Sequence, residues 1–244
     1  LPFHGFEGPG GRSSVGSGVV VSEAGYILTN HHVIKEGTDP RVKLHGGEEL
    51  PARLVGADEK TDLALLKVDP KAPLTPALFG DSDRMEVGEW VLAIGSPFGL
   101  PQSVSIGIIS ALHRNLGEGP YDDYLQTDAT INPGNSGGPL ANIRGEVIGI
   151  NTAIFAQGRQ TLGVGIGFAI PINQAKAVLD DLRHKGYPVR GRIGASLAEV
   201  PAEEARRLGI SPRRGAKLAE VVRGGPAEQA GLKRGDVIVE FGGA

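Results

Sequence analysis

Short apolar segments separated by turn-forming residues make up most of the chain as far as residue 171. The segments SGVVVS, YILTN, LALLKV, EWVLAIG and GEVIGINTAI are rich in β-branched residues and have the length of strands. Strand-sized segments at this spacing, without helical patterns between them, are typical of an antiparallel sandwich or barrel. The pattern therefore predicts a mainly β domain over residues 15–171.

The segment that follows has the period of an amphipathic helix. In INQAKAVLDDLRHK the apolar residues that would share one face are Ile172, Ala175, Val178, Leu179 and Leu182. Gly186 comes next, and glycine commonly ends helices because it adopts a left-handed conformation easily. We expect a linker helix within residues 172–189.

The two ends of the chain follow other patterns. Residues 190–244 show a short strand near Ile193, helical PAEEARRLG, a strand KLAEVV, a short helix in PAEQAG and a strand DVIVEF. This order predicts a separate α+β module. Residues 1–14 are rich in Gly, Pro and Ser, so they predict an extended arm.

Composition narrows the class of protein. The 244 residues include 38 glycines, which fits many tight turns, and no cysteine, which excludes disulfides, thiolate nucleophiles and thiolate zinc sites. The formal net charge is −3, so we expect no nucleic-acid partner. No apolar run reaches the roughly 18 residues of a membrane span, and LPFHGFEGPG lacks the features of a signal peptide. We expect a soluble protein whose targeting or anchor segment lies outside this sequence.

The strongest chemical motif is GNSGGP at residues 134–139. A nucleophilic serine needs backbone N–H groups directed at the oxyanion that forms when it attacks a carbonyl. Gly134 can adopt the dihedral angles that place its N–H beside that of Ser136. Gly137 and Gly138 are expected to leave the serine uncovered for a substrate strand. The motif predicts a serine nucleophile rather than an incidental serine in a glycine-rich turn.

A serine nucleophile needs a base, and histidine is the usual one. The six histidines are His4, His31, His32, His45, His113 and His184. His31 and His32 follow the predicted strand YILTN, where an exposed side chain can be held in place. His4 lies in the arm and His184 in the predicted helix, so both are poor candidates. The pattern alone does not separate His31 from His32.

The base in turn needs a carboxylate that orients it. Asp62 directly precedes the apolar strand LALLKV, and Asp58 and Asp69 are nearby alternatives. We favour Asp62 because the segment KTDLA places its carboxylate against apolar sequence, where burial without a partner is costly.

These residues resemble a known family. The order His, Asp, Ser with GNSGGP is similar to the chymotrypsin-like serine proteases. The segments TNHHVI, TDLALLKV, GSPFGL, SIGIISAL, QTDATINPGNSGGPL and GIGFAIP resemble the HtrA/Deg proteases within that class. The resemblance implies a mainly β fold, namely a chymotrypsin-like double six-stranded β-barrel followed by a partial α+β PDZ domain. It also implies that His32 is the base, Asp62 the orienting acid and Ser136 the nucleophile, with Gly134, Asn135 and Ser136 forming the oxyanion hole.

The resemblance makes further predictions for the protease domain. Asn135 replaces the aspartate of digestive relatives, so we expect reversible ordering of loops instead of activation by cleavage. The loops expected to take part are His113–Tyr124, Thr130–Pro133 and Phe155–Gly163. The substrate-binding residues are expected to be Ile131, Thr152, Ile154 and Phe155, whose apolar members favour a small aliphatic side chain before the cut.

Two further segments are implied to bind partners. Arg192, Ile193, Gly194 and Ala195 resemble the PDZ loop that captures the terminal carboxylate of a peptide through backbone N–H groups. We expect this PDZ domain, over residues 190–244, to lack the helix that forms the other wall of its groove. Phe3 and Phe6 in the arm are expected to contact neighbouring subunits of a homotrimer.

Together these observations predict an ATP-independent serine endopeptidase of HtrA/Deg type that degrades unfolded or damaged polypeptides in the periplasm or cell envelope, without a metal or other cofactor. The alternative is a largely inactive chaperone or peptide-binding scaffold that uses the protease fold and the PDZ domain. An esterase of another fold is disfavoured, because there the histidine comes last in the chain.

Overall fold

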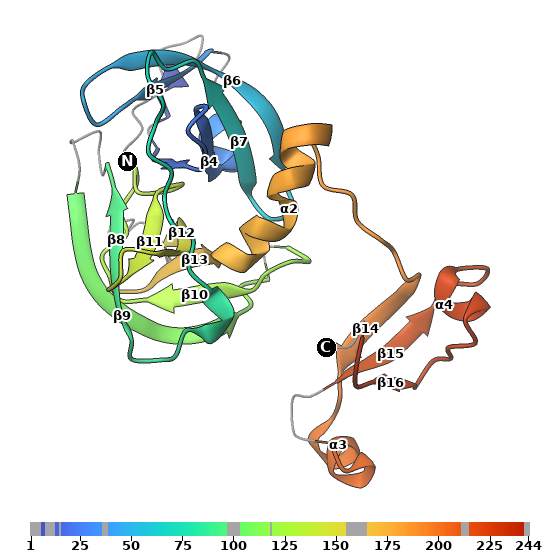
Figure 1. Ribbon diagram of the computed structural model, residues 1–244. Coiled ribbons are helices and arrows are strands. Elements are labelled where there is room, and N and C mark those ends of the chain that lie inside the picture. The colour runs from blue at the N-terminus through green and yellow to red at the C-terminus, as the bar shows by residue number, and fades with distance from the viewer. Residues whose placement is uncertain are drawn as a thin grey trace. The chain divides into compact units, whose positions relative to one another are not determined.

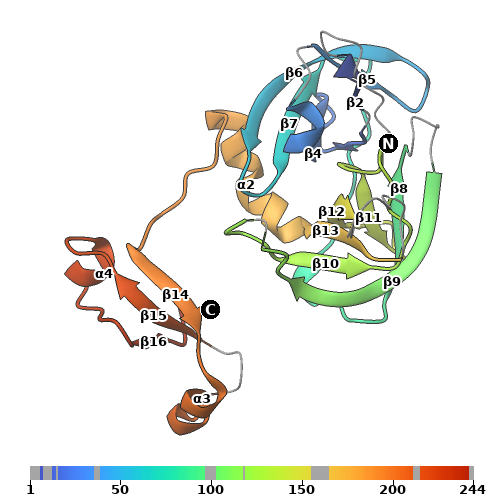
Figure 2. The same ribbon diagram turned by 180° about the vertical axis from the view of Figure 1, so that it is seen from behind.

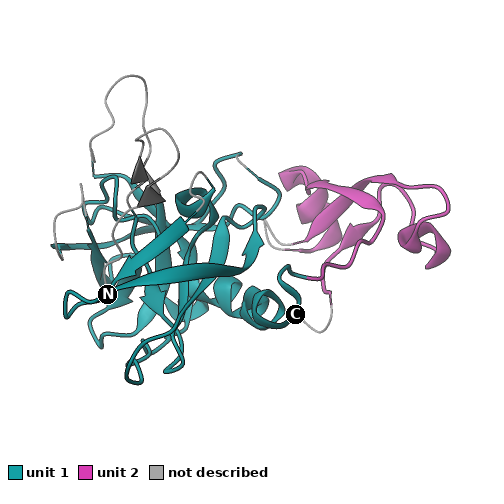
Figure 3. Ribbon diagram, turned by 90° about the horizontal axis from the view of Figure 1, so that it is seen from above, with its two compact units in different colours: residues 1–188 teal, residues 189–244 magenta. Residues whose placement is uncertain are grey.

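A computed structural model describes residues 6–7, 13–14, 16–35, 39–96, 103–117, 119–154, 165–210 and 215–241. The chain divides into two units, residues 1–188 and 189–244 (Figure 3). The first consists mainly of strands and the second is a small α+β unit. The mainly β class predicted from the sequence is therefore confirmed.

The N-terminal half of the first unit forms a seven-stranded sheet in the order β2-β1-β5-β6-β7-β4-β3. Figure 1 labels its strands β4 to β7. Its strands are β1 (Phe6–Glu7), β2 (Ser13–Ser14), β3 (Val19–Val20), β4 (Tyr26–Asn30), β5 (Asp39–Lys43), β6 (Glu49–Asp58) and β7 (Leu63–Val68), and the short helix α1 (His31–Ile34) follows β4. The described strands of this half form an open order where the sequence suggested a six-stranded barrel. The predicted extended arm contributes β1, which pairs with β5.

The second half closes into a six-stranded barrel, β10-β13-β12-β11-β8-β9. Its strands are β8 (Trp90–Gly95), β9 (Ser103–Arg114), β10 (Tyr124–Thr127), β11 (Pro139–Asn142), β12 (Val147–Ile154) and β13 (Gly167–Pro171), and the 3-10 helix η1 (Ser82–Arg84) precedes them. All pairings in this barrel are antiparallel. The predicted barrel is thus confirmed for this half.

Helix α2 (Ile172–Lys185) packs on both halves (Figure 1 and Figure 2). It contacts β6 and β7 of the sheet as well as β12 and β13 of the barrel. Its predicted apolar face is buried at Ile172, Ala175, Val178 and Leu182. Gly186 ends the helix in the left-handed region with φ 83°, as proposed from the sequence. The helix is therefore part of the first unit rather than a free linker.

Two of the buried apolar clusters serve one half each and a third joins them. The joining cluster includes Leu28 and Leu65 of the sheet, Ile150 and Ile170 of the barrel, and Leu182 of α2. Burial of large aliphatic side chains contributes about 1.5–3 kcal/mol each. The two halves that carry the candidate site are therefore held together by a common core.

The second unit has a three-stranded sheet in the order β14-β15-β16. Its elements are β14 (Ala195–Glu199), α3 (Ala202–Leu208), β15 (Ala216–Val221), α4 (Pro226–Gln229) and β16 (Val237–Ile238). The first strand begins at Ala195, so Ile193 lies in the loop before it. In the described part of the chain, no helix is both long and apolar enough to cross a membrane.

Candidate active site

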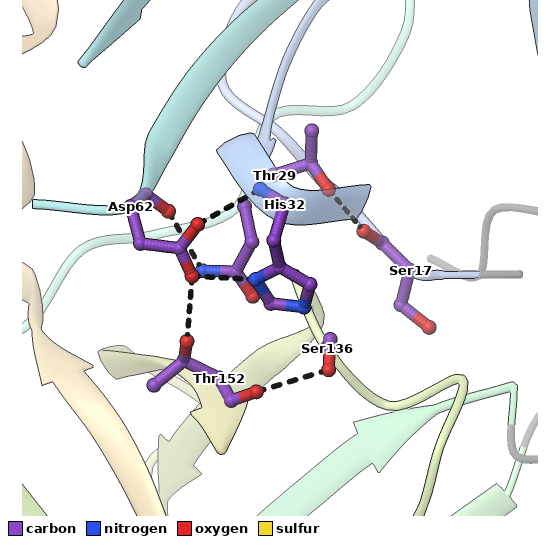
Figure 4. A network of polar contacts seen from close by, with 7 residues as sticks. Ser17, Thr29, His32, Asp62, Ser136 and Thr152 are labelled. Atoms are coloured by element: carbon purple, nitrogen blue, oxygen red, sulfur yellow. Dashed lines mark hydrogen bonds and ion pairs between the residues drawn. The ribbon is translucent and has the colours of Figure 1, made fainter. Parts of the chain in front are cut away.

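His32 and Asp62 meet because their segments flank neighbouring strands. His32 is the second residue of α1, which follows β4, and Asp62 directly precedes β7, which pairs with β4. His32 Nδ1 lies 2.6 Å from Asp62 Oδ2 (Figure 4). Since the partner is a carboxylate, Nδ1 is assigned as the protonated nitrogen, which leaves Nε2 as an acceptor.

The position of Asp62 is fixed by four further hydrogen bonds. The main-chain N–H of His32 donates to Asp62 Oδ1 at 2.8 Å. The main-chain oxygen of Asp62 accepts from His31 N at 3.0 Å and from Asn30 Nδ2 at 2.9 Å. Thr152 Oγ1 donates to Asp62 Oδ2 at 2.9 Å. Two of these bonds satisfy N–H groups at the start of α1 that no helical carbonyl can reach.

Ser136 lies on the loop between β10 and β11 of the barrel. Its hydroxyl donates to the main-chain oxygen of Thr152 at 3.0 Å. Thr152 therefore joins Ser136 to Asp62, and through Asp62 to His32, in one polar network (Figure 4). The structure brings the three candidate side chains together, with the serine proton directed at Thr152 rather than at His32.

The turn before Ser136 has a defined type. Asn135 N donates to Asn132 O at 2.9 Å, and Gly134 has φ 103°. Pro133 as second residue and a positive φ at the third residue are the features of a type II turn. Glycine at position 134 is thus required by the backbone conformation, as the motif suggested.

The N–H groups of this turn differ in their partners. Across the part of the chain that the structure describes, the N–H groups of Gly134 and Ser136 have no acceptor, whereas that of Asn135 bonds to Asn132. Two donors beside the Ser136 hydroxyl are therefore available for an oxygen atom of a ligand. Asn135, expected in the same role, has its N–H occupied and its side chain buried.

Ser17 supports this loop and was not found from the sequence. It is fully buried. Its hydroxyl donates to Gly134 O at 2.7 Å and accepts a hydrogen bond from Ser96 N at 3.0 Å. Its main-chain N–H donates to Ser136 O at 2.7 Å. Ser17 and Gly134 are 117 positions apart, so no local pattern could have indicated the contact.

Gly137 and Gly138 play a different part from the one expected. Both are buried, and a Cβ atom at Gly137 would overlap the carbonyl oxygen of Ser17. A Cβ atom at Gly138 would overlap the carbonyl oxygen of Ile94. These glycines allow close packing of the loop against β8 and the segment before β3 instead of uncovering the serine.

The other candidate acids have separate partners. Asp69 is exposed and pairs with Lys67 Nζ at 2.5 Å. Asp58 is buried and accepts a hydrogen bond from the Thr61 hydroxyl. Of the other histidines, His113 pairs with Asp123 at 2.9 Å, on the strand and loop that precede β10. Of the histidines that the structure describes, only His32 is joined to Asp62 by its ring.

A cleft of about 540 Å³ lies beside His32 and Thr152. Its wall includes a Lys35–Glu59 ion pair at 3.0 Å, with Lys60 and Asp122 nearby. The hydrogen bond and charge of Lys35, with a smaller contribution from His31, hold the pKa of the Glu59 carboxyl below its usual value. The cleft beside His32 thus has a polar, charged wall.

The predicted substrate-binding residues are not all placed near this cleft. Thr152 lines it, whereas Ile131 is buried in the barrel core, where its side chain packs against Gly167. Ile154 ends β12, and Phe155 and the loop Phe155–Gly163 lie outside the described residues. Phe3 also lies outside them, and Phe6 is placed only by the pairing of β1.

The predicted carboxylate loop of the second unit is held by its own carbonyl groups. Ile193 O accepts from Ala227 N and Gly194 O accepts from Val222 N, both at 2.8 Å. Gly194 is buried with φ 71°. Arg192 is exposed and Ala195 begins β14, whose other edge carries no strand in the described sheet. In the described residues, no group of His, Asp or Glu side chains could hold a metal ion.

Comparison with known proteins gives consistent matches for both units. The trypsin-like peptidase domain model matches residues 16–150, and a PDZ domain model matches residues 218–244. A probable periplasmic serine endoprotease DegP-like of Rhizobium meliloti is 49% identical over 93% of this chain and 45% of its own length. The corresponding protein of Halomonas elongata is 51% identical over 95% of this chain and 48% of its own length. The chain thus spans about half the length of these curated relatives.

Solved structures agree with this result. The HtrA-type protease AlgW with tripeptide has a TM-score of 0.80 and 46% sequence identity, covering 93% of this chain and 75% of that one. AlgW with decapeptide has a TM-score of 0.76 at 46% identity, covering 93% and 70% of the two chains.

Proposed function

Because the chain belongs to the trypsin-like peptidase family, and within it to the HtrA-type proteases, we propose that it is an ATP-independent serine endopeptidase whose catalytic residues are His32, Asp62 and Ser136. The observation that carries this proposal is the hydrogen-bonded network that joins these three side chains through Thr152. No metal or organic cofactor has a role in the proposed reaction.

The proposed reaction starts with rotation of the Ser136 hydroxyl away from Thr152 O and toward His32 Nε2. His32 accepts the hydroxyl proton while Ser136 Oγ bonds to the carbonyl carbon of the substrate. Asp62, bound to Nδ1 at 2.6 Å, stabilises the resulting imidazolium. The carbonyl oxygen, now an oxyanion, accepts hydrogen bonds from the N–H groups of Gly134 and Ser136.

The tetrahedral adduct then breaks at its C–N bond. His32 returns the proton to the leaving nitrogen, and an acyl-enzyme ester on Ser136 remains. Water attacks this ester with His32 again as the base, which releases the second product and restores the serine. Each oxyanion donor is worth about 2.7–4 kcal/mol of transition-state stabilisation in comparable enzymes, so the two free N–H groups support this reaction strongly.

The matching experiment is cleavage of unfolded casein by the parent protein and by Ser136→Ala. We expect cleavage by the parent and none by the variant, with an unchanged circular-dichroism spectrum. Equal cleavage by both proteins would contradict the proposal.

The comparisons favour the peptidase over the alternative, a largely inactive chaperone or peptide-binding scaffold. In the structure the Ser136 hydroxyl donates to Thr152 O rather than to His32. A serine that kept this bond would leave the site inactive. A scaffold would prevent aggregation of an unfolded protein without cutting it, whereas a peptidase with a rotating serine side chain would do so only while degrading it.

The partners of the proposed enzyme follow from its relatives. Unfolded polypeptides are the proposed substrates, and the names of the curated relatives support a periplasmic location. The AlgW structures hold bound peptides, which supports a peptide ligand for the second unit beside β14.

The outer face of the barrel supports self-association, proposed as a homotrimer. Three apolar side chains on this face are more than half exposed, namely Trp90 of β8 and Val104 and Ile106 of β9. The residues of β8 that point to the opposite face, Val91 and Ala93, are buried. The pairing of β8 with β9 places these exposed residues on one face. A contiguous apolar face of this kind typically marks an interface, so copies of the chain would cover it.

A further inference from the structure

A buried carboxyl group lies four residues before Asp62, the proposed orienting acid, and has no assigned role in the reaction described above. Asp58 is the last residue of β6 and is 4% exposed. Its Oδ2 accepts a hydrogen bond from the Thr61 hydroxyl, and its Oδ1 accepts from Lys60 N at 3.3 Å. Thr61 is also buried, at 6% exposure. The side chain of Asp58 thus closes the turn that connects β6 to β7.

Burying a carboxyl group at such a position costs free energy. Burying it is unfavourable unless its oxygens are hydrogen-bonded, and here Lys60 N and the Thr61 hydroxyl of the turn both donate to it. An apolar side chain would fill the space at lower cost. These two hydrogen bonds hold the conformation of the turn.

This turn has an unusual backbone at its end. Asp62 has φ 54°, in the left-handed region that non-glycine residues rarely occupy. Such a residue persists only where the surrounding structure holds it in place. The strand pairing ends at Asp58 and Leu63, so residues 59–62 are held by the bonds of Asp58 on one side and by the contacts of Asp62 with α1 on the other.

The strand that leads into the turn is itself anchored. Ala57 N donates to Gly186 O at 3.0 Å. A Cβ atom at Gly56 would lie 2.5 Å from the carbonyl oxygen of Leu182, so β6 packs directly against the end of α2. With β6 fixed in this way, any relaxation after loss of the Asp58 contacts would be taken up by residues 59–62.

From this geometry we infer that Asp58, acting through Thr61, is a positioning residue that holds the Asp62 carboxylate against His32. The inference rests on the proposed peptidase function. The bond that would suffer is the 2.6 Å contact between Asp62 Oδ2 and His32 Nδ1, which is worth most when His32 becomes protonated during the reaction. Small displacements of catalytic groups can lower rates by about a hundredfold, so a loosened turn should act on kcat rather than on substrate binding.

The test uses paired variants in the full chain. Thr61→Val removes the hydroxyl group that donates to Asp58, and Thr61→Ser retains it. In the second pair, Asp58→Ala removes the acceptor and Asp58→Asn keeps one acceptor oxygen. Asp69→Ala is the control, because its carboxylate is exposed and pairs with Lys67 rather than with the turn. The readouts are kcat and KM on a peptide amide, the pH profile of kcat/KM, titration with a fluorophosphonate probe and the midpoint of thermal unfolding.

We expect Thr61→Val and Asp58→Ala to lower kcat at least tenfold with KM within about twofold of the parent. The acid limb of their pH profile should move to lower pH, because an imidazolium without a firmly held carboxylate forms less readily. Thr61→Ser and Asp69→Ala should behave like the parent. The double variant of Asp58→Ala with Thr61→Val should be no worse than Asp58→Ala alone, since Asp58→Ala already removes the acceptor of the Thr61 hydroxyl.

One result would overturn this inference but leave the proposed function standing. The parent would be active and labelled by the probe, and Thr61→Val and Asp58→Ala would lose thermal stability while keeping the parent's kcat and acid limb. If Asp58→Ala does not fold, the comparison of Thr61→Val with Thr61→Ser decides the question. A parent protein that neither cleaves the peptide nor takes up the probe would overturn the proposed function, and this inference with it.

Discussion

The hydroxyl of Ser136 donates its hydrogen bond to the main-chain oxygen of Thr152, at 3.0 Å. The side chain of Thr152 in turn donates to Asp62 Oδ2 at 2.9 Å. One residue of β12 therefore contacts the serine with its backbone and the carboxylate with its side chain. Thr152 was expected to bind substrate, and its place in the network indicates that it also orients Asp62.

Replacing Thr152 by valine tests this second contact. The variant keeps the carbonyl group and the shape of the side chain but leaves Asp62 Oδ2 without one donor. Hydrogen bonds to charged groups are worth about 1.5–3 kcal/mol, so kcat should fall about tenfold or more. Steady-state kinetics on a peptide amide measure this, with Thr152→Ser as the variant that retains the hydroxyl. Equal kcat for the valine and serine variants would show that the hydroxyl does not matter.

The packing of the nucleophile loop predicts unequal costs for two glycines. Gly137 and Gly145 have φ of 85° and 76°. Alanine at either position would therefore adopt a left-handed conformation, which costs about 1–2 kcal/mol. A Cβ atom at position 145 meets open space, whereas at position 137 it overlaps Ser17 and Thr29.

Gly137→Ala should therefore lower the free energy of unfolding by about 1–3 kcal/mol more than Gly145→Ala does. Urea denaturation followed by tryptophan fluorescence measures both. The interpretation of Gly137 as a packing glycine fails if the two variants have the same stability.

The acid stability of the first unit should depend on Asp81. Hydrogen bonds from the Asn173 side chain and from Asp83 N hold the pKa of its carboxyl below the usual value. Because the folded-state pKa is lowered, the stabilisation is present above the unfolded pKa of about 3.9 and is lost as the pH falls through the folded value.

Asp81→Asn should consequently be less stable than the parent at pH 6, and the difference should shrink as the pH falls from about 4 toward 2. Urea midpoints across this range provide the measurement. A stability difference that stays constant with pH would mean that the charge of Asp81 contributes nothing.

The exposed face of β8 and β9 makes a prediction about assembly. If this face lies between copies of the chain, Ile106→Glu should place charges at the interface and dissociate the trimer. Light scattering should then give three times the chain mass of 25.4 kDa for the parent and the single-chain mass for the variant. Leu54→Glu, an exposed apolar position on β6, should leave the trimer intact. A parent of single-chain mass would contradict the assignment of this face.

The sequence was informative where the chemistry is local. GNSGGP indicated Ser136 because the type II turn and the close packing of its loop both require glycine within a few residues of the serine. KTDLA favoured Asp62 over Asp58 and Asp69, and the structure indeed joins only Asp62 to the His32 ring. The spacing of short apolar segments likewise predicted an antiparallel sandwich or barrel, and the helical period of residues 172–185 predicted the buried face of α2.

Contacts between distant segments could not be read in the same way. Ser17 supports Gly134 and Ser136 across more than a hundred positions, and a single serine between two glycines carries no local signal. Ile131 is apolar whether it lines a pocket or fills the core, and packing decided for the core. Whether the sheet of the N-terminal half closes depends on whether its edge strands β2 and β3 pair with each other, which strand patterns alone do not specify.

The most direct test of the whole account is covalent labelling by a fluorophosphonate probe, read by intact mass and peptide mapping. We expect one label per chain on Ser136 in the parent protein, a strongly reduced rate in His32→Ala and no label in Ser136→Ala. Two results would contradict the claim that Ser136, His32 and Asp62 form a working peptidase site. One is labelling that persists in Ser136→Ala, and the other is a folded parent that stays unlabelled while a protease control is labelled.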